Sequence, residues 1–139
     1  MKTIVILLAA VLVVGCTHNG GAKASAGAQT QAAKDEAGLA AALKGRVAGT
    51  PQDCVNEADL GATKSYGRNV IVFTDRNDDV LWVNRPAGGC PAIEGGRALR
   101  LRTPATRFCR GDVVTVFDPS TGIGFGSCAL GEFTPYRAP

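Results

Sequence analysis

The sequence Phe-Cys-Arg-Gly-Asp-Val-Val-Thr-Val-Phe, residues 108–117, places a thiol, a guanidinium group and a carboxylate next to one another. Such a group could be a reactive thiol, an adhesive Arg-Gly-Asp tripeptide or the structural start of a strand. A catalytic thiol needs a base, and residues 51–139 contain no histidine. An adhesive tripeptide needs the tip of an exposed loop, whereas β-forming residues follow Asp112 at once. We therefore expect Cys109 to fasten the strand, Gly111 to permit a turn or bulge, and Asp112 to end the loop.

The cysteines of the same region form an even set, Cys54, Cys90, Cys109 and Cys128. A zinc site does not fit them, because they include no Cys-x-x-Cys pair and the region offers no histidine. Two disulfides fit, since an exported domain of this size gains ~2–4 kcal/mol of stability from each typical bond. Three pairings are open. We prefer Cys54 with Cys128 and Cys90 with Cys109, because these join segments separated by intervening strands.

The acidic residues indicate no catalytic or metal-binding constellation. Residues 75–79, Asp-Arg-Asn-Asp-Asp, suggest a calcium loop, but an EF-hand loop needs glycine at its sixth position and glutamate at its twelfth. Val80 and Pro86 stand there instead, so we interpret the segment as a solvated hairpin tip. No Ser-His pair and no phosphate-binding glycine loop is recognisable in the sequence. We therefore expect no enzyme activity, no cofactor and no metal.

Five arginines fall within fourteen residues that contain no acid: Arg97, Arg100, Arg102, Arg107 and Arg110. Arginine suits bidentate contact with phosphate or carboxylate, so the strip is a candidate surface for an anion or a partner protein. The alternative is that it is the charged outer face of a half-exposed sheet, where cations guard strand edges against aggregation. Both interpretations stay open.

The N-terminus has the pattern of a secretory signal peptide, with Lys2 followed by an apolar run of about 13 residues. This run is shorter than the ~20 residues that span a bilayer as a helix. Its end, Val-Val-Gly-Cys at residues 13–16, resembles the bacterial lipobox, which implies removal of residues 1–15 and attachment of several acyl chains to Cys16. The alternative is ordinary cleavage nearby. Because Thr17 replaces the aspartate that commonly retains such lipoproteins at the inner membrane, we expect the periplasmic face of the outer membrane in a bacterial cell envelope.

Residues 16–50 are rich in Ala, Gly, Ser, Thr, Gln and Lys and contain almost no large apolar side chain. Such a segment buries too little surface to offset the entropy of ordering it, which predicts a flexible tether. The alternative for part of this segment is one short helix at residues 34–43, because Asp35 and Glu36 would lie in its first turn. Residues 51–139 then form a single domain.

Alternating apolar residues and turn sequences divide this domain into short strands, with almost no helical periodicity. We predict two hairpins and one half-buried strand. The first hairpin joins residues 69–74 and 79–84, the second joins residues 112–117 and 123–128, and the single strand covers residues 97–103.

Gly122, Gly124 and Gly126 alternate at the second of these hairpins. Such glycines indicate strong curvature, as at a barrel corner, or the close approach of a ligand or of an aromatic ring such as Trp82 or Phe117. The expected fold class is all-β: a small antiparallel barrel or strongly rolled sheet of five to seven strands, stapled by two disulfides.

Three sequences, Gly-Cys-Pro at residues 89–91, Phe-Cys-Arg-Gly-Asp-Val-Val at 108–114 and Cys-Ala-Leu-Gly-Glu-Phe-Thr-Pro at 128–135, follow a cysteine near the domain start. Together they resemble a family of small exported proteobacterial proteins known only as a domain of unknown function. The resemblance covers residues 54–135. It implies export and disulfides, but no activity, ligand or catalytic residue.

The charge of the chain argues against nucleic acid as a partner, because 15 Lys and Arg against 12 Asp and Glu give only +3, and removal of Lys2 lowers this to +2. We expect a non-catalytic binding or structural module that reaches the membrane through its lipid and contacts an anionic envelope component or an envelope protein. The alternative is an inhibitor or shield against an envelope hydrolase such as lysozyme. The positive charge counts against it, since lysozymes are usually basic.

Overall fold

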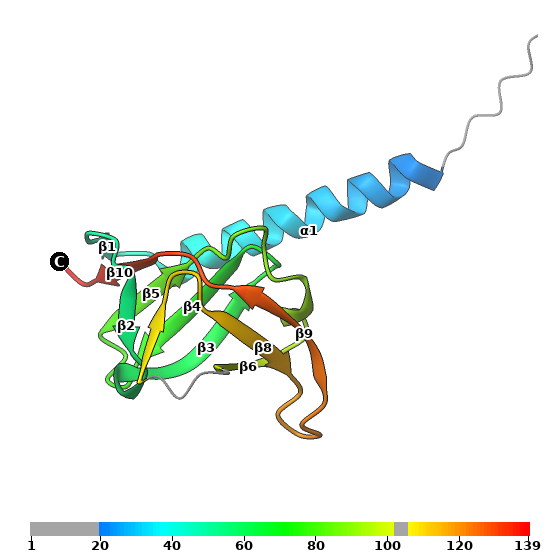
Figure 1. Ribbon diagram of the computed structural model, residues 1–139. Helices are drawn as coiled ribbons and strands as arrows, with labels where there is room; N and C mark the ends of the chain where they lie inside the picture. The colour runs from blue at the N-terminus through cyan, green and yellow to red at the C-terminus, as the bar shows by residue number, and fades with distance from the viewer. Residues whose placement is uncertain (1–19, 102–105) are drawn as a thin grey trace, which may run out of the picture.

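The computed structural model of the chain describes residues 20–101 and 106–139, with side chains from residue 26 onward. One helix, α1 (Gly20–Ala42), precedes a body of antiparallel strands (Figure 1). The predicted signal peptide, the predicted lipid site at Cys16 and the side chain of Arg102 lie outside the described residues. Of the helices in the described part, none is long and apolar enough to cross a membrane.

Ten strands form three sheets in the described part of the chain. The largest sheet has the order β1-β10-β5-β4-β3, the second pairs β2 with β7, and the third has the order β6-β8-β9. The strands are β1 (Val47–Ala48), β2 (Cys54–Asn56), β3 (Leu60–Tyr66), β4 (Val70–Asp75), β5 (Val80–Asn84), β6 (Ala98–Leu101), β7 (Arg107–Cys109), β8 (Val113–Phe117), β9 (Gly124–Ala129) and β10 (Phe133–Arg137). Two short 3₁₀ turns, η1 (Glu57–Asp59) and η2 (Pro91–Ile93), complete the list.

Both predicted hairpins are present. β4 pairs with β5, with Val72 opposite Val83, and β8 pairs with β9, with Val114 opposite Cys128. The half-buried strand predicted at residues 97–103 is β6, whose two leucines pack against the core. The prediction of an antiparallel β-domain with two disulfides is therefore confirmed.

The three sheets do not close into a barrel within the described residues. β3 pairs only with β4, and β6 pairs only with β8, so each of them leaves one edge without a partner strand. The strand number also exceeds the predicted five to seven. Five of the ten strands were not placed by the prediction. Of these, β1, β2 and β7 have two or three residues each, which is too short for alternation to be recognised in a sequence, whereas β3 and β10 have seven and five residues.

Strand β4 is buried on both faces, which explains its uninterrupted apolar run. Phe73 faces the space between the sheets, where its ring lies 6.0 Å from that of Phe108 and 5.7 Å from that of Phe133. Val70 and Val72 face the opposite side and pack under α1. Each such side chain contributes about 1.5–3 kcal/mol through burial, so β4 stabilises both layers at once.

Helix α1 is longer than the helix predicted at residues 34–43, and it differs from the flexible tether predicted for residues 16–50. Its C-terminal end packs on β4 and β5 through Leu39, which is only 4 % exposed, and through Leu43 one turn later. This i, i+4 pair is a narrow apolar stripe, visible as such only once a sheet is known to lie beneath it. The other end of α1 runs away from the sheets (Figure 1).

The alternating glycines produce a bulge. The register of β8 and β9 shifts between Val116 and Phe117, and Gly126 has a φ of 132°, which favours glycine. The predicted cover by an aromatic ring is wrong. A Cβ on Gly126 would meet the methyl group of Ala92 at 3.7 Å, and one on Gly124 would meet Thr115. The glycines therefore serve curvature at the strand end.

The number of disulfides agrees with the prediction, but the preferred pairing is wrong. Cys54 is bonded to Cys109, and Cys90 is bonded to Cys128. Cys54 lies directly opposite Cys109 in the ladder of β2 and β7, two strands that the sequence did not reveal. Cys90 precedes η2 and ties this turn to β9.

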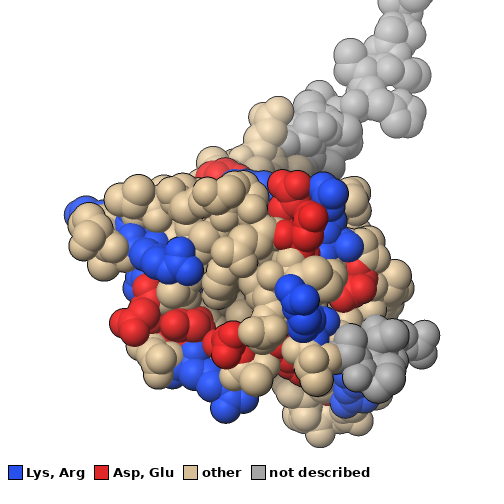
Figure 2. All heavy atoms as spheres, turned by 60° about the vertical axis from the view of Figure 1, so that its left-hand side comes forward, with Lys and Arg blue, Asp and Glu red and all other residues tan. Residues whose placement is uncertain are grey.

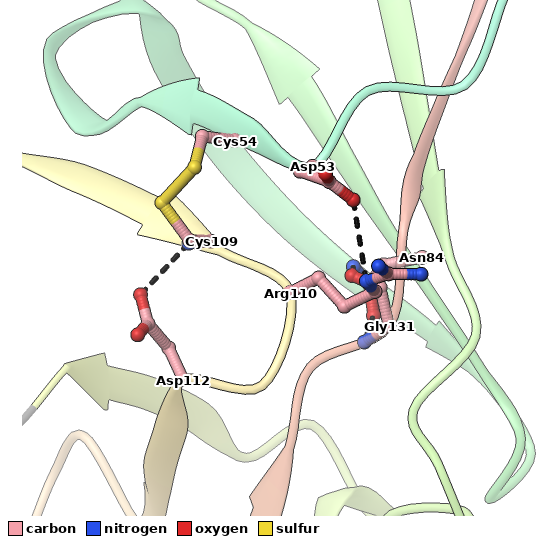
Figure 3. Close-up of a disulfide and its surroundings, with 7 residues drawn as sticks. All are labelled: Asp53, Cys54, Asn84, Cys109, Arg110, Asp112 and Gly131. Carbon is pink, nitrogen blue, oxygen red and sulfur yellow. Dashed lines mark hydrogen bonds and ion pairs between the residues drawn. A yellow bond between two sulfur atoms is a disulfide. The ribbon is translucent and has the colours of Figure 1, made fainter.

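Asn84 at the end of β5 is a fully buried polar side chain, 0 % exposed. Its amide donates to the carbonyl of Gly131 at 2.8 Å and accepts from the Gly131 N–H at 2.9 Å (Figure 3). Gly131 approaches the Arg85 backbone so closely that a Cβ would overlap the Arg85 carbonyl. Position 131 therefore requires glycine, and the Asn84 amide secures the link between β9 and β10.

Replacing Asn84 with alanine should lower the free energy of unfolding by about 2–4 kcal/mol, because two hydrogen bonds at a buried site are lost together. Urea denaturation measures this change. The matched control is Asn77→Ala at the exposed tip of the β4–β5 hairpin, where we expect a change within about 0.5 kcal/mol. Equal destabilisation by the two variants would contradict the assigned role of Asn84.

The two disulfides should also differ in their accessibility to reductant. Cys54 and Cys109 are partly exposed, whereas Cys90 is 0 % and Cys128 8 % exposed. Because thiol–disulfide exchange requires access to a sulfur atom, brief reduction of the folded chain should open Cys54–Cys109 first. Alkylation followed by peptide mass spectrometry measures the order, and earlier labelling of Cys90 and Cys128 is the result that refutes it.

Candidate functional site

The Arg-Gly-Asp sequence forms a tight turn between β7 and β8 (Figure 3). The Cys109 N–H donates to Asp112 Oδ2 at 2.8 Å, and the Asp112 N–H donates to the Cys109 carbonyl at 3.1 Å. Gly111 has a φ of 87°, a conformation that favours glycine. This geometry agrees with the structural interpretation of the stretch.

The same turn is bound to the connection between β9 and β10. The Gly111 N–H donates to the Leu130 carbonyl at 2.8 Å, and the Leu130 N–H donates to the Asp112 carbonyl at 2.9 Å. The turn is therefore hydrogen-bonded to Leu130 as well, so both its carboxylate and its backbone groups take part in interactions within the domain.

Arg110, the cation of this turn, is shared by two acids. Its Nε lies 3.2 Å from Asp53 Oδ1, and its Nη1 donates to Glu132 Oε1 at 2.8 Å. The three side chains are at least half exposed, so each pair contributes at most about 1 kcal/mol. Because its charge is neutralised locally, Arg110 is a weak candidate for contact with an external anion.

Arg97 and Arg100 have a different environment, because each guanidinium group stacks on a phenylalanine ring. The distance from the guanidinium carbon to the ring centroid is 3.8 Å for Arg97 on Phe125 and 4.4 Å for Arg100 on Phe117. Arg97 also donates to the carbonyl of Ala92 at 2.7 Å. Among the residues that the structure describes, neither arginine forms an ion pair. Stacking restrains the guanidinium plane and leaves N–H groups at its edge for a ligand.

The predicted arginine strip is therefore divided in the structure. Arg100 lies on β6 in the sheet β6-β8-β9 and Arg97 directly precedes this strand, whereas Arg107 is exposed on β7 opposite Asn56, in the small sheet with β2. On the face shown in Figure 2, Lys and Arg are interspersed with Asp and Glu rather than gathered into one basic region. The stacked pair is the part of the strip with a restrained geometry, with Arg100 exposed and Arg97 half-buried.

Asp118 lies in the turn between β8 and β9 and adds a negative charge near this pair. Its carboxylate accepts hydrogen bonds from the Ser120 hydroxyl, from the Ser120 N–H at 2.7 Å and from the Thr121 N–H at 3.2 Å. These bonds, the Ser120 hydroxyl first, hold the pKa of Asp118 below its ordinary value, and the charge of Arg97 lowers the pKa further.

The acidic hairpin tip at residues 75–79 makes hydrogen bonds that stabilise the hairpin. Asp75 Oδ1 accepts from the Val80 N–H at 3.1 Å, and the guanidinium group of Arg46 donates to the carbonyls of Asp78 and Asp79. Over residues 20–101 and 106–139, no group of three His, Cys, Asp or Glu side chains is arranged to hold a metal ion.

A groove of about 560 Å³ lies where α1, β3 and the loop before β6 meet. Thr63, Lys64 and Ser65 of β3 form one wall, and residues 94–97, Glu-Gly-Gly-Arg, form another. Gln31 and Asp35 of α1 close one side. Nothing in the sequence pointed to this groove, because it depends on which strand edges remain unpaired. The sequence indicated the stacking of Arg100 on Phe117 only weakly, because it placed both residues on predicted strands.

No protein-family model, curated protein or solved structure matches this chain. The resemblance of residues 54–135 to a family of exported proteobacterial proteins therefore stays a prediction.

An NMR titration of the Asp118 carboxyl should give a midpoint below that of an ordinary aspartate. Because the pKa is lowered in the folded chain, ionised Asp118 stabilises the hairpin above the ordinary aspartate pKa, and this contribution is lost as the pH falls through the lowered value. Ser120→Ala removes the largest cause and should raise the midpoint. Thr121→Ala keeps the backbone donor and should leave it nearly unchanged, so an equal rise in both variants would count against this assignment.

Proposed function

We propose that the chain is a non-catalytic binding module of the bacterial cell envelope, in which Arg97 and Arg100 contact an anionic envelope component. The observation that carries the proposal is the stacking of the two guanidinium groups on Phe125 and Phe117 without an ion-pair partner among the described residues. A restrained guanidinium group loses less side-chain entropy when it binds phosphate or carboxylate than a free one does.

The position of Arg100 on β6, with Arg97 directly before this strand, supports the same function. Arg100 is exposed, and β6 is an edge strand whose outer side has no partner strand in the described part of the chain. The neighbouring hairpin adds apolar surface, since Ile123 is 58 % and Phe125 44 % exposed. An anionic ligand with an apolar portion would satisfy both kinds of surface.

The proposed attachment to the membrane rests on the N-terminal sequence and on α1. We propose that Cys16 carries the lipid and that the chain then continues into α1, whose 23 residues span about 35 Å at ~1.5 Å per residue. Because the end of this helix packs on β4 and β5, it would hold the domain away from the bilayer as a stiff spacer. The periplasmic face of the outer membrane offers phosphate and carboxylate groups within that reach.

The double variant Arg97→Glu/Arg100→Glu tests the proposal in a co-sedimentation assay with the full chain. Purified peptidoglycan sacculi supply carboxylates in one arm, and lipopolysaccharide micelles supply phosphates in the other. We expect at least tenfold weaker binding in one arm, because charge-assisted hydrogen bonds contribute about 1.5–3 kcal/mol each.

The control variant is Arg76→Glu/Arg85→Glu, which changes the net charge equally at two exposed arginines that directly follow β4 and β5. The proposal predicts that this control retains most of the binding. An equal loss in both double variants would indicate attraction by net charge alone, and unchanged binding of the Arg97/Arg100 variant would refute the site.

A further inference from the structure

The groove between α1, β3 and the loop before β6 runs along a strand edge, and the register of β3 shows this. Thr63 lies opposite Phe73, which faces the core, whereas Lys64 lies opposite Val72, which faces α1. Side chains of adjacent strand residues point to opposite faces of a sheet. Because both Thr63 and Lys64 line the groove, the groove must extend around the free edge of β3 rather than over one face.

The exposure of β3 supports the same geometry. Residues 61–64 are all exposed, although every second side chain of a strand over a core should be covered. Thr63 is on the core side and is nevertheless open to solvent. No backbone hydrogen bond in the described residues joins this edge to β6, the other unpaired edge. The groove therefore exposes backbone N–H and C=O groups of β3 that have no partner strand.

The walls of the groove indicate what could bind there. Gly95 and Gly96 have φ values of 84° and 77° and leave the middle of one wall, between Glu94 and Arg97, without side chains, while Thr63 and Ser65 contribute hydroxyl groups to the other. The charged lining residues balance, with Asp35 and Glu94 against Lys64 and Arg97. A ligand with a large net charge gains little binding energy from such walls. A ligand with bulky side chains gains little from hydroxyl groups and bare backbone.

We propose that this groove binds an extended peptide segment of a partner protein, with small uncharged side chains, which pairs with the edge of β3 as an added strand. Unpaired strand edges are recognised in this way because the ladder of backbone hydrogen bonds supplies affinity. The regular part of the edge, residues 63–65 after the register shift between Leu60 and Thr63, spans about 10 Å at ~3.4 Å per residue, enough for about three residues of peptide. The site goes beyond the proposed anion contact and shares only Arg97 with it.

A second copy of this chain is a poorer occupant. Antiparallel pairing of two β3 edges about a twofold axis near residues 63–64 would bring Lys64 close to Lys64 of the other copy. Like charges across a strand pair destabilise it, and lysine on an edge is a common guard against this pairing. The charge arrangement of β3 therefore favours a heterologous strand.

Selection from a displayed library of random nine-residue linear peptides, with the purified full chain as bait, tests the proposal. Enriched peptides are then titrated by fluorescence anisotropy. We expect Thr63→Arg, which places a long charged side chain in the groove, to weaken their binding at least tenfold. The matched control, Thr50→Arg, makes the same change at an exposed position outside the groove and should leave binding unchanged.

Hydrogen exchange measured by mass spectrometry distinguishes strand pairing from a side-chain contact. Strand pairing should slow the exchange of backbone amides, whereas a side-chain contact alone should not. Peptide binding should slow the exchange of amides in residues 61–66, both in the wild-type chain and in Arg100→Glu, which leaves the lining residues of the groove unchanged. Slower exchange in this variant, together with weaker anion binding, would separate the two sites. Failure to enrich any peptide, binding that tolerates Thr63→Arg, protection confined to other strands, or a dimer that already protects β3 would each overturn the proposal.

Discussion

The three sheets of this protein are held in register by one short piece of backbone, the peptide between Leu130 and Gly131. The Asn84 amide binds Gly131 and so ties the end of β5 to it. The turn between β7 and β8 binds Leu130 from the other side. The five-stranded sheet thus contributes the Asn84 amide, and the turn that joins the other two sheets contributes backbone groups of Gly111 and Asp112. The absence of a Cβ at position 131 is the condition for this arrangement, since the Arg85 carbonyl occupies the place where it would be.

The two disulfides restrain the segments around Leu130 and Gly131 and add to the hydrogen bonds there. Cys54–Cys109 crosses the small ladder of β2 and β7, and Cys90–Cys128 secures η2 against β9. The backbone hydrogen bonds at Leu130 are then made between segments that are already restrained covalently. A domain of about 90 residues buries too little surface to rely on its core alone, so covalent and hydrogen-bonded restraints at one place reinforce each other.

Local patterns in the sequence predicted the local parts of this fold. The β4–β5 and β8–β9 hairpins follow from alternation and turn residues, and β6 follows from the alternation of leucine and arginine. The parts that failed depend on partners distant in the chain. Leu39 and Leu43 become an apolar stripe only above β4 and β5, and the disulfide pairing follows from the short ladder of β2 and β7. The five arginines are close in sequence, yet Arg100 and Arg107 lie on strands of different sheets. The groove depends on the unpaired edge of β3, a non-local property that no single segment encodes.

The position of β10 has a consequence for the time at which the fold can form. This strand comprises residues 133–137, almost the last of the chain, yet it lies between β1 and β5 inside the largest sheet. Phe133 is 0 % exposed and belongs to the core cluster. A chain that emerges from a ribosome with its N-terminus first therefore cannot complete this sheet until residues 133–137 have emerged, because β10 is the strand that joins β1 to β5.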